Sequence, residues 1–424
     1  MKTPRILFLG LLGATVPAAA GPGEYPITDF GAVAGGTALN TAAIQAAIDA
    51  ATARGGGTVV VPAGVFRSGA IFLKPGVGLH LAAGAVLKGS ENIEDYPKLM
   101  TRIEGHFEPW RMALVNARGL AGLRLSGPGK LDGSGPVYWR AFWARRKENP
   151  RCTNLEVERP RLLFLDRCTD VRIENLALED AGFWNLHLYR CRDVLIEGVR
   201  ITIPSATAGL RGPSTDGIDV DSSQNVTIRR CYISTHDDNI ALKGSKGPLA
   251  DQDQDSPPVE NILVEDCETG DGNGLITCGS EATVVRNVTV RNCVMSGRAT
   301  VLTLKLRPDT PQHYENITIE NIRLAGGGRL LNVAPWTQFF DLKGLPAPSR
   351  TVNNITLRNI RGSYRTLGVL RGNPGDTLRD ITLEDIDVTL ADEVFAPGPV
   401  QNLALNNVVV NGKPFSVPAP AVKP

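Results

Sequence analysis

Val171-Arg172-Ile173-Glu174-Asn175-Leu176 is one copy of a degenerate pattern that recurs through the second two thirds of the chain. In each copy, aliphatic or β-branched residues alternate with polar ones, and Asn, Asp, Arg or Gly precedes another apolar residue. The other copies begin at Val194, Val226, Ile262, Val288, Ile317, Ile355, Ile381 and Leu403. The intervals between copies are 23, 32, 36, 26, 29, 38, 26 and 22 residues. Repeats of this length are typical of solenoids, and the longer intervals indicate inserted loops.

The repeat unit predicts strands rather than a leucine-rich repeat. It is rich in Val, Ile, Thr and Asn, it lacks the regular Leu spacing, and it carries few helix signals. Short strands of period 2, separated by Gly, Asn and Asp corners, favour a parallel β-helix. We therefore predict an all-β fold, a single-stranded right-handed parallel β-helix. Residues one coil apart would then lie roughly 4.8 Å from each other.

The N-terminal part differs from the repeats. Residues 40–54 carry apolar side chains at helical spacing, with Asn40 or Thr41 as the N-cap and Gly55-Gly56-Gly57 as the stop. The apolar positions are Ile44, Ala47, Ile48 and Ala51. We predict a short helix that caps the open end of the β-helix. The domain prediction is one catalytic domain over residues 21–424, in which about residues 21–80 form the cap and first coils.

Composition and the first residues narrow the function classes. The 45 basic and 44 acidic residues leave a formal charge of +1, so no overall field favours nucleic acid or an anionic membrane surface. Residues 1–20 resemble a signal peptide, with Lys2 and Arg5, an apolar run and an Ala18-Ala19-Ala20 cleavage site. We predict an exported protein, periplasmic or secreted, without membrane insertion.

The cysteines fit the repeat register. Cys231, Cys267 and Cys293 occupy the same position in their copies, and Cys168 and Cys191 form a second matched pair. The Cβ atoms of in-register parallel neighbours point the same way, which is unfavourable for a disulfide. CxxC or Cys/His spacings are absent from the sequence. We predict buried thiols stacked in the core, without a metal or redox role.

The sequence feature that points most directly to a chemical reaction is a predicted cluster of three carboxylates. Superposing Ile218 and Val220 on Ile240 and Leu242, 22 residues later, brings Asp216 over Asp238. Asp237 then lies over Thr215, so a coil of that period gathers three carboxylates at one place. Adjacent strand residues face opposite ways, so Asp237 and Asp238 share a site only at a bend. Clustered acids of this kind are what hydrolysis of a glycosidic bond requires.

Several motifs resemble known pectin-degrading β-helix enzymes. They are Asp29-Phe30-Gly31-Ala32, the segments 43–49 and 55–64, and Leu131-Asp132-Gly133. Ser214-Thr215-Asp216-Gly217 and the Asp237-Asp238 pair resemble glycoside hydrolase family 28, the polygalacturonases and their relatives. The resemblance runs from about Tyr25 to Val410.

The resemblance implies roles for the three aspartates. In the family, Asn-Thr-Asp, Asp-Asp, Gly-His-Gly and Arg-x-Lys motifs line one cleft, and hydrolysis inverts the anomeric centre. By position, Asp237 is similar to the general acid, and Asp216 and Asp238 to the pair that activates water. Repulsion between stacked Asp216 and Asp238 would help to keep Asp237 protonated near neutral pH.

Departures from the family motifs modify the predicted substrate site. Asn273 stands where the family has a histidine, and Ser214 where it has an asparagine. The amide of Asn273 can hydrogen-bond a carboxylate or a sugar hydroxyl, but it cannot carry a proton. At the Arg-x-Lys position, alternation places Lys305 and Arg307 on one face, where both cations suit a uronate carboxylate. We predict Asn273, Lys305 and Arg307 as substrate-binding residues.

Two further side chains are candidates for substrate binding. Trp336 follows Lys305 by about one longer coil, and it is either a platform for a sugar ring or part of the packing. His187 lies one to two coils before Asp216, and a structural hydrogen-bonding role stays open for it. The Asp251, Asp253 and Asp255 string lacks the glycine and downstream glutamate of an EF-hand loop, so no metal is expected.

The sequence therefore predicts an exported glycoside hydrolase that cleaves galacturonate-containing pectic poly- or oligosaccharides by inversion. A polygalacturonase, an exo-galacturonidase and a rhamnogalacturonan hydrolase all fit. We expect a monomer that needs no cofactor and binds no nucleic acid. Two alternatives stay open. One is a β-helix polysaccharide lyase, often calcium-dependent, and the other is a non-catalytic sugar-binding β-helix that lost activity with the histidine.

Overall fold

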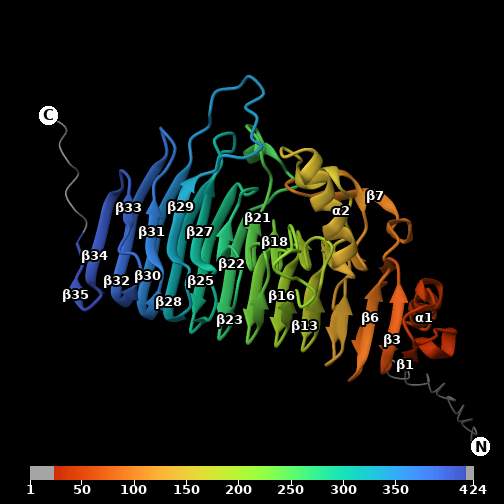
Figure 1. Cartoon of the computed structure of the whole chain (residues 1–424). Coiled ribbons are helices and arrows are strands. Elements are labelled where there is room, and N and C mark those ends of the chain that lie inside the picture. Colours follow the sequence, from red (N-terminus) through yellow and green to blue (C-terminus); the bar gives the residue numbers. More distant parts are fainter. Residues whose placement is uncertain (1–22, 417–424) are drawn as a thin grey trace, which may run out of the picture.

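The computed structural model describes residues 23–416 as a stack of coils. Figure 1 shows the stack running from α1 (Thr41–Ala53) at one end to β35 (Lys413–Pro414) at the other. The predicted signal peptide, residues 1–20, lies outside the described residues, so it stays a prediction. Among the described residues, no helix combines the length and the apolar character needed to cross a membrane.

The strands form two long sheets and one hairpin. The hairpin pairs β7 (Lys98–Ile103) with β8 (His106–Arg111). The shorter long sheet contains β4 (Ile71–Phe72), β9 (Val115–Arg118), β12 (Leu163–Asp166), β15 (Leu186–Tyr189), β18 (Ile218–Asp221), β21 (Ile240–Lys243), β24 (Gly274–Cys278), β27 (Thr300–Leu306), β29 (Arg329–Pro335), β31 (Thr366–Leu370) and β33 (Phe395–Pro397). We call this eleven-stranded sheet the cleft sheet, since the site described below lies on it.

The larger sheet holds the remaining strands. They are β1 (Gly23–Pro26), β2 (Gly57–Val61), β3 (Gly64–Ser68), β5 (Val77–Leu81), β6 (Ala85–Gly89), β10 (Arg124–Ser126), β11 (Lys130–Asp132), β13 (Thr169–Glu174), β14 (Ala177–Glu179), β16 (Arg192–Glu197), β17 (Arg200–Thr202), β19 (Gln224–Arg229), β20 (Tyr232–Ser234), β22 (Val259–Glu265), β23 (Glu268–Thr269), β25 (Val284–Arg291), β26 (Val294–Met295), β28 (His313–Ala325), β30 (Thr351–Tyr364), β32 (Thr377–Leu390), β34 (Gln401–Val410) and β35. The helical segments besides α1 are α2 (Gly135–Glu148), η1 (Ile27–Phe30), η2 (Ile93–Asp95), η3 (Asn154–Glu156) and η4 (Ala250–Gln252).

Each central coil contributes three strands, and each strand pairs in parallel with its equivalent in the next coil. Thus β18, β19 and β20 pair with β21, β22 and β23. Every predicted repeat start pairs with the next one: Val171↔Val194, Val194↔Val226, Val226↔Ile262, Ile262↔Val288, Val288↔Ile317, Ile317↔Ile355, Ile355↔Ile381 and Ile381↔Leu403. The parallel β-helix prediction is therefore confirmed, with the register read from the sequence.

Side chains that alternate inward fill the core. Ile262 and Val264 of β22 are buried, whereas Leu263 between them is partly exposed. The seven cysteines are all free and buried, and the Sγ of Cys267 accepts a hydrogen bond from the backbone N–H of Cys231 at 3.4 Å. The predicted internal stack of thiols is confirmed.

Asparagines occupy the coil corners in the left-handed conformation. Asn292, Asn321 and Asn359 have φ values of 56°, 57° and 49°. The side chain of Asn321 donates to Asn292 at 3.0 Å, and that of Asn359 donates to Asn321 at 2.7 Å. Asparagine tolerates this conformation better than most residues, and its amide can donate and accept at once. These side-chain hydrogen bonds therefore link the corners of successive coils, in addition to the backbone hydrogen bonds of the sheets.

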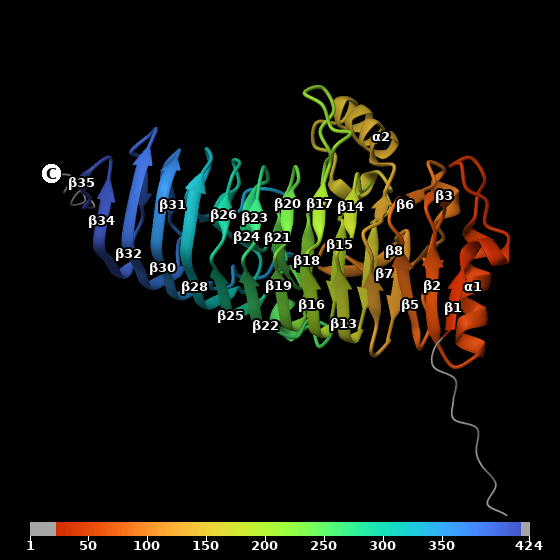
Figure 2. The ribbon, with the colours of Figure 1, turned by 90° about the horizontal axis from the view of Figure 1, so that it is seen from below.

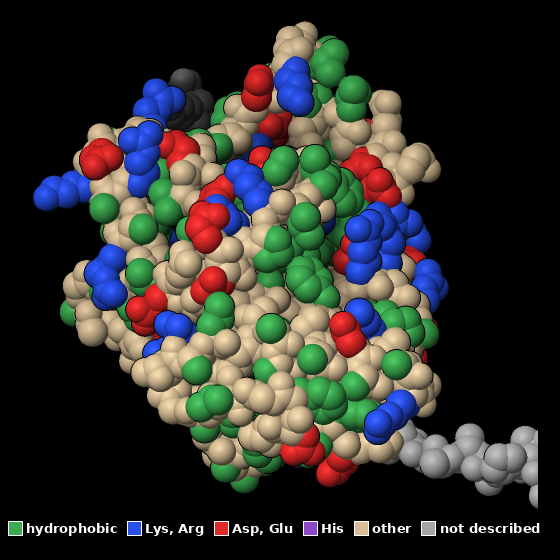
Figure 3. Space-filling view, turned by 90° about the vertical axis from the view of Figure 1, so that its right-hand side faces the viewer, with side chains coloured by type: hydrophobic (Ala, Val, Ile, Leu, Met, Phe, Trp, Pro, Cys, Tyr) green, Lys and Arg blue, Asp and Glu red, His purple; other side chains and the backbone are tan. Residues whose placement is uncertain are grey.

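The predicted capping helix forms at the N-terminal end. Helix α1 spans Thr41–Ala53 with Asn40 as its N-cap, and the four predicted apolar residues are its buried ones. Gly57, just after the helix, has φ 150°, and a Cβ there would lie 2.5 Å from the Gly23 carbonyl oxygen. Figure 3 faces this end of the stack and shows polar and charged atoms around smaller apolar patches.

Helix α2 and the β7–β8 hairpin were not predicted. Figure 1 shows both on the upper side of the stack, and Figure 2 shows α2 standing off one side of it. Trp139 of α2 is buried, and its indole N–H donates to the carbonyl of Ala181 at 2.9 Å. Trp110 of β8 is buried as well, and its indole donates to the carbonyl of Arg159 at 3.1 Å. Both insertions are thus fixed to the coils that precede the carboxylate cluster.

Truncating a core residue of one coil tests the inward and outward alternation. We expect Ile262→Ala to lower the free energy of unfolding by about 2–5 kcal/mol, because it leaves a cavity between two coils. The matched variant Leu263→Ala removes a similar side chain from the outer face and should cost under about 1.5 kcal/mol. Urea denaturation measures both values. Equal losses would contradict the assigned register.

Candidate active site

The predicted stacking of the aspartates is confirmed by the strand register. Ile218 of β18 pairs with Ile240 of β21, so Asp216 and Asp238 stand one coil apart at equivalent positions. The backbone N–H of Gly217 donates to the carbonyl of Asp238 at 2.9 Å. A Cβ on Gly217 would lie 2.4 Å from the Asn239 carbonyl oxygen, so this close approach requires glycine. The two carboxylates are therefore fixed by the coil itself.

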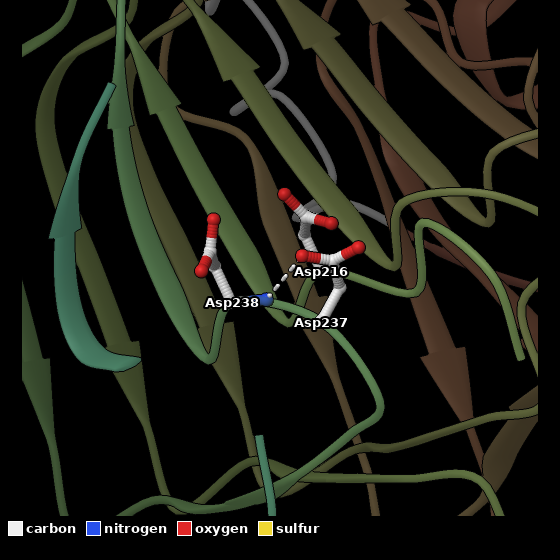
Figure 4. Close-up of side chains that lie close together, drawn as sticks. All are labelled: Asp216, Asp237 and Asp238. Atoms are coloured by element: carbon white, nitrogen blue, oxygen red, sulfur yellow. Dashed lines mark hydrogen bonds between the residues drawn. The ribbon is translucent and has the colours of Figure 1, made fainter. Parts of the chain in front are cut away.

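Asp237 joins them because the chain bends before β21. Residues 236 and 237 form a bend, as the shared site of Asp237 and Asp238 requires. One carboxylate oxygen from each of Asp216, Asp237 and Asp238 lies within 4.8 Å of the other two. Figure 4 shows the three carboxyl groups beside one another, with the Asp238 backbone N–H donating to Asp237 Oδ1 at 3.0 Å.

Asn273 lies beside Asp237. Its side-chain amide donates to Asp237 Oδ1 at 2.8 Å, and its backbone N–H donates to the Asp237 carbonyl oxygen at 2.9 Å. Burial raises the pKa of Asp237 to about 7, and the neighbouring Asp216 and Asp238 carboxylates add to the rise. Asp237 is therefore a carboxyl group that retains its proton in part near neutral pH.

Two lysines balance the other carboxylates. The Lys305 Nζ lies 2.6 Å from Asp238 Oδ2, and the Thr277 hydroxyl donates to Asp238 Oδ1 at 2.9 Å. Burial lowers the pKa of Lys305, but the Asp238 carboxylate outweighs it and raises the value overall. Asp238 thus has a donor for each carboxylate oxygen.

Lys243 is the centre of a second buried group of charges. Its Nζ lies 3.1 Å from Asp216 Oδ2, 3.5 Å from Asp219 Oδ1 and 3.6 Å from Glu281 Oε2. It also lies 4.6 Å from the centre of the Trp184 ring. Burial raises the pKa of Asp216, and the Lys243 ammonium group opposes that rise. Burial also raises the pKa of Glu281, but Lys243 and Lys246 outweigh it and hold that value well below normal.

Asp219 lies at the bottom of this cluster. Its side chain is fully buried, and neither carboxylate oxygen has a hydrogen-bond partner among the described residues. Burial raises the pKa of Asp219 well above its usual value, and the adjacent Asp216 carboxylate contributes. Asp219 therefore holds a proton next to the Asp216 carboxylate, which limits the negative charge that Lys243 must balance.

The carboxylates open into a cavity of about 750 Å³ on the cleft sheet. One wall comes from Phe142 and Trp143 of α2 and from the segment before β18. The opposite wall comes from Glu104, in the β7–β8 turn, and from the segment after β29. The side chain of Asn154 donates to Glu104 Oε1 at 2.9 Å. This hydrogen bond joins the two walls at the N-terminal end of the cavity.

The structure places four of the five predicted substrate-binding residues on this cavity. Asn273, Lys305, Arg307 and Trp336 all line it. The Lys305 Nζ lies 5.1 Å from the centre of the Trp336 ring. Arg307 is buried and donates to both carboxylate oxygens of Asp309 at 2.9 Å, so its guanidinium is already paired. Lys305 and Arg307 lie on one side as alternation predicts, but both already hold carboxylates of this chain.

His187 is placed away from the cavity, as a structural hydrogen-bonder. Its side chain is fully buried, its Nδ1 lies 2.8 Å from an Arg161 nitrogen, and its Nε2 lies 3.4 Å from Asp221 Oδ2. Burial lowers the pKa of His187 to about 4 although Asp221 opposes this, so the ring is neutral. Arg102 of β7 donates to the same Asp221 oxygen at 3.1 Å. The prediction that His187 binds substrate overlooked the hairpin, which covers this face.

The three aspartates have the donor type and spacing that a divalent cation accepts. However, Lys243 and Lys305 already contact two of them, and Asp237 has a raised pKa, which opposes metal binding. The residues present therefore do not favour a cation, and the chemistry below is derived from the side chains alone.

Sequence reasoning missed Lys243, Glu281 and Thr303. Lys243 alternates outward from Ile240 and Leu242 and pairs in register with Asp221, so the pattern placed it on the correct face. Glu281 follows β24 in a loop, for which the repeat gives no direction. Thr303 faces the cavity at the first position of the Arg-x-Lys motif, and its hydroxyl has no hydrogen-bond partner among residues 23–416.

Comparisons with known proteins agree with this geometry. The sequence profile described as "Glycosyl hydrolases family 28" matches residues 55–404. An "Exopolygalacturonase" of Zea mays is 26% identical over 372 residues, which are 82% of this chain and 79% of that protein. A "Probable polygalacturonase" of Vitis vinifera is 32% identical over 226 residues, 51% of this chain and 43% of that protein, so the match spans less than half of that relative.

A solved structure has the same fold. The exopolygalacturonase of Thermotoga maritima superposes with a TM-score of 0.73 over 92% of this chain and 92% of its own. The sequence identity is 24%, so this likeness supports the architecture of the described coils and no finer property.

Removing the central ammonium group tests the charge balance. We expect Lys243→Met to lower the free energy of unfolding by about 3 kcal/mol at pH 7, because buried carboxylates lose their cation. Burial already raises the pKa of Asp216 against Lys243, so without Lys243 we expect the folded-state pKa of Asp216 to rise further above its unfolded value of about 4. A group with a raised folded pKa loses stability as the pH rises through that range, so the loss is smaller at pH 4.5.

Urea denaturation of both proteins at pH 4.5 and pH 7 measures this difference. Lys130→Met is the control, because Lys130 is exposed and pairs with Glu179 on the outer surface. That substitution should cost under about 1 kcal/mol at either pH. A loss for Lys243→Met that does not depend on pH would show that the ammonium group does not balance these carboxylates.

Proposed function

The chain belongs to glycosyl hydrolase family 28, and from this premise we propose that it hydrolyses galacturonate-containing pectic chains by inversion. The family resemblance seen in the sequence is confirmed, and the chain is a glycoside hydrolase of the polygalacturonase type. The proposal adds the linkage, the stereochemistry and the roles of individual residues. Each of these rests on the geometry of the cavity and is open to the experiments below.

The observation that carries the mechanism is one protonated carboxyl group beside two that are paired with lysines. Asp237, with its pKa near 7, is the general acid that protonates the departing glycosidic oxygen. Asn273 donates to Asp237 Oδ1, which leaves Oδ2 free to carry the proton toward the substrate. The amide thereby orients the acid, although it cannot replace the proton relay of a histidine.

Asp216 and Asp238 would hold the attacking water. Their nearest oxygens lie within 4.8 Å, and a water that donates to both spans up to about 5.6 Å at hydrogen-bond length. Lys243 and Lys305 each contact one of these two carboxylates. The ammonium groups offset the negative charge of these two carboxylates, one of which would accept a proton from the water as it attacks.

The charge of the cavity favours an acidic sugar. Nine basic side chains line it: Arg146, Arg211, Lys243, Lys246, Arg298, Lys305, Arg307, Arg329 and Arg365. Five acidic side chains do so: Glu104, Asp216, Asp237, Asp238 and Glu281. A lining with more cations than anions concentrates anionic ligands. Trp336 is partly exposed on the same cavity and offers a ring face to a pyranose.

The closed end of the cavity favours attack at a chain end. The hydrogen bond from Asn154 to Glu104 joins the two walls, and the Lys246 Nζ lies 3.6 Å from Glu104 on the same side. A polysaccharide lying along the coils would meet this barrier directly beyond the carboxylates. We therefore favour exo-action, which is also the activity in the name of the Zea mays relative.

We also propose that the protein is exported, because residues 1–20 carry a signal-peptide pattern.

Two alternative functions are less well supported. A lyase would use a neutral base and produce unsaturated ends, whereas each lysine of this cavity is paired with a carboxylate. The non-catalytic alternative rests on the replacement of the family histidine by Asn273.

Replacing the acid tests the mechanism. We expect Asp237→Asn to lower kcat by about 10²–10⁴-fold, because the leaving oxygen no longer receives a proton. In the wild-type enzyme, kcat/KM should fall as the pH rises above about 7, where Asp237 loses its proton. Asp266→Asn is the control, since Asp266 occupies an exposed corner that is Asn292 in the next coil. Full activity in Asp237→Asn would refute the assignment.

The type of products tests inversion and exo-action. On polygalacturonate, we expect new reducing ends with little fall in viscosity, and mono- or disaccharides as the first products. Proton NMR during the first minutes should show the anomer opposite to that of the cleaved bond, in the presence of a chelator. Retained configuration, early loss of viscosity or unsaturated products would each contradict one part of the proposal.

A further inference from the structure

Three arginines mark the starts of three successive strands on the cleft sheet. Arg298 lies two residues before β27, Arg329 is the first residue of β29, and Arg365 directly precedes β31. Arg329 pairs in register with Thr366, the neighbour of Arg365. All three line the cavity that holds the carboxylates. Successive strands lie about 4.8 Å apart, so the row extends about 10 Å toward the C-terminal end of the stack.

Two of these arginines have no side-chain partner among the described residues. Arg329 and Arg365 are exposed, and neither makes an ion pair or a side-chain hydrogen bond with any residue in the range 23–416. Several arginines on the larger sheet, by contrast, pair with a glutamate of the neighbouring coil. Examples are Arg291 with Glu265 at 2.6 Å and Arg358 with Glu320 at 2.5 Å. The cavity row is therefore left with unbalanced positive charge.

Arg298 is held in place but remains accessible. It donates to both carboxylate oxygens of Asp271, at 3.2 and 3.3 Å, while 78% of its side chain stays exposed. Its guanidinium has further N–H groups to offer, because arginine carries five donors.

The backbone between the arginines is bare. Gly327 and Gly328 line the cavity between Arg298 and Arg329. A Cβ on Gly328 would lie 2.2 Å from the Ala299 carbonyl oxygen, so a side chain does not fit there. A Cβ on Gly327 would meet the Arg298 Cγ at 3.7 Å and nothing else within 4 Å. The contact at Gly328 comes from the neighbouring coil, whereas the missing side chain at Gly327 lets a ligand approach the chain beside the guanidinium groups.

We propose that Arg298, Arg329 and Arg365 form an extended binding row for successive uronate units of the substrate, on the open side of the carboxylate cluster. A guanidinium fork matches a carboxylate in shape and charge, and a polyuronate presents one carboxylate per sugar. The closed end limits the other side of the cluster to a short chain end, so the rest of a longer substrate would extend over this row. The row rests on the proposed function, since it names the sugars that extend beyond the scissile bond.

Binding of oligogalacturonates tests the row apart from hydrolysis. The double variant Arg329→Gln/Arg365→Gln is compared with the parent, both carrying Asp237→Asn so that the ligand is not consumed. We expect the Kd for pentagalacturonate to rise at least about tenfold, and the Kd for digalacturonate to rise much less. Methyl-esterified pentagalacturonate lacks the charge and should not distinguish the two proteins. Isothermal titration calorimetry measures these values.

Arg361→Gln is the matched control. Arg361 lies four residues before Arg365 in the same coil, is exposed, and pairs in register with Arg323 on the larger sheet rather than lining the cavity. It should leave the Kd for pentagalacturonate unchanged. Raising the NaCl concentration should weaken binding of the parent more than that of the double variant, because exposed charges are screened.

The outcomes separate the row from the proposed function. If the wild-type enzyme hydrolyses oligogalacturonates and the double variant keeps its affinity for the pentamer, the row is wrong and the function stands. If the row variants lose affinity but the wild-type enzyme hydrolyses no oligogalacturonate, the row stands and the hydrolytic function falls. If pentagalacturonate binds neither protein, the row is overturned as well.

Discussion

In-register stacking of parallel strands is the constraint on which the rest of this molecule depends. A coil places each residue beside its equivalent one period away, so a side chain's neighbours are set by the interval between repeats. The core stacks of Ile and Val, the thiol stack and the asparagine corners all follow from this rule. The active site follows from it too, because the 22-residue step from Ile218 to Ile240 brings Asp216 beside Asp238.

Charge balance is the second constraint, and the coil geometry creates it. Five carboxyl groups, from Asp216, Asp219, Asp237, Asp238 and Glu281, share a small region with two ammonium groups, Lys243 and Lys305. Such a cluster cannot be fully ionised at low cost, since buried unpaired charges are strongly destabilising. Burial and the neighbouring carboxylates accordingly raise the pKa values of Asp219 and Asp237, whereas Lys243 and Lys246 hold that of Glu281 low. Asp237 is also the carboxyl that the proposed mechanism requires in its protonated form.

The sequence predicts the parts of the site that the coil register determines. The repeat pattern located the pairing of every repeat start from Val171 onward and the stacked aspartates, because these depend on local alternation and spacing. It did not predict what covers the outer face. His187 alternates outward and looked accessible, but Arg102 of the hairpin and Arg161 enclose it. Arg307 also faces outward as predicted, but Asp309, two residues later, folds back and pairs with it.

The division between coil and insertion corresponds to a division of tasks in the enzyme. Residues placed by the register supply the general chemistry, and they sit on strands whose pairing on both sides resists movement. The walls come from α2, the hairpin and the segments before β18 and after β29, and α2 and the hairpin are anchored to the coils by buried side chains such as Trp139 and Trp110. Loop changes of this kind alter where a polysaccharide can lie without disturbing the stacked carboxylates. Part of the substrate site therefore lies outside the repeat, which is why the reaction type follows from the sequence more directly than the sugar does.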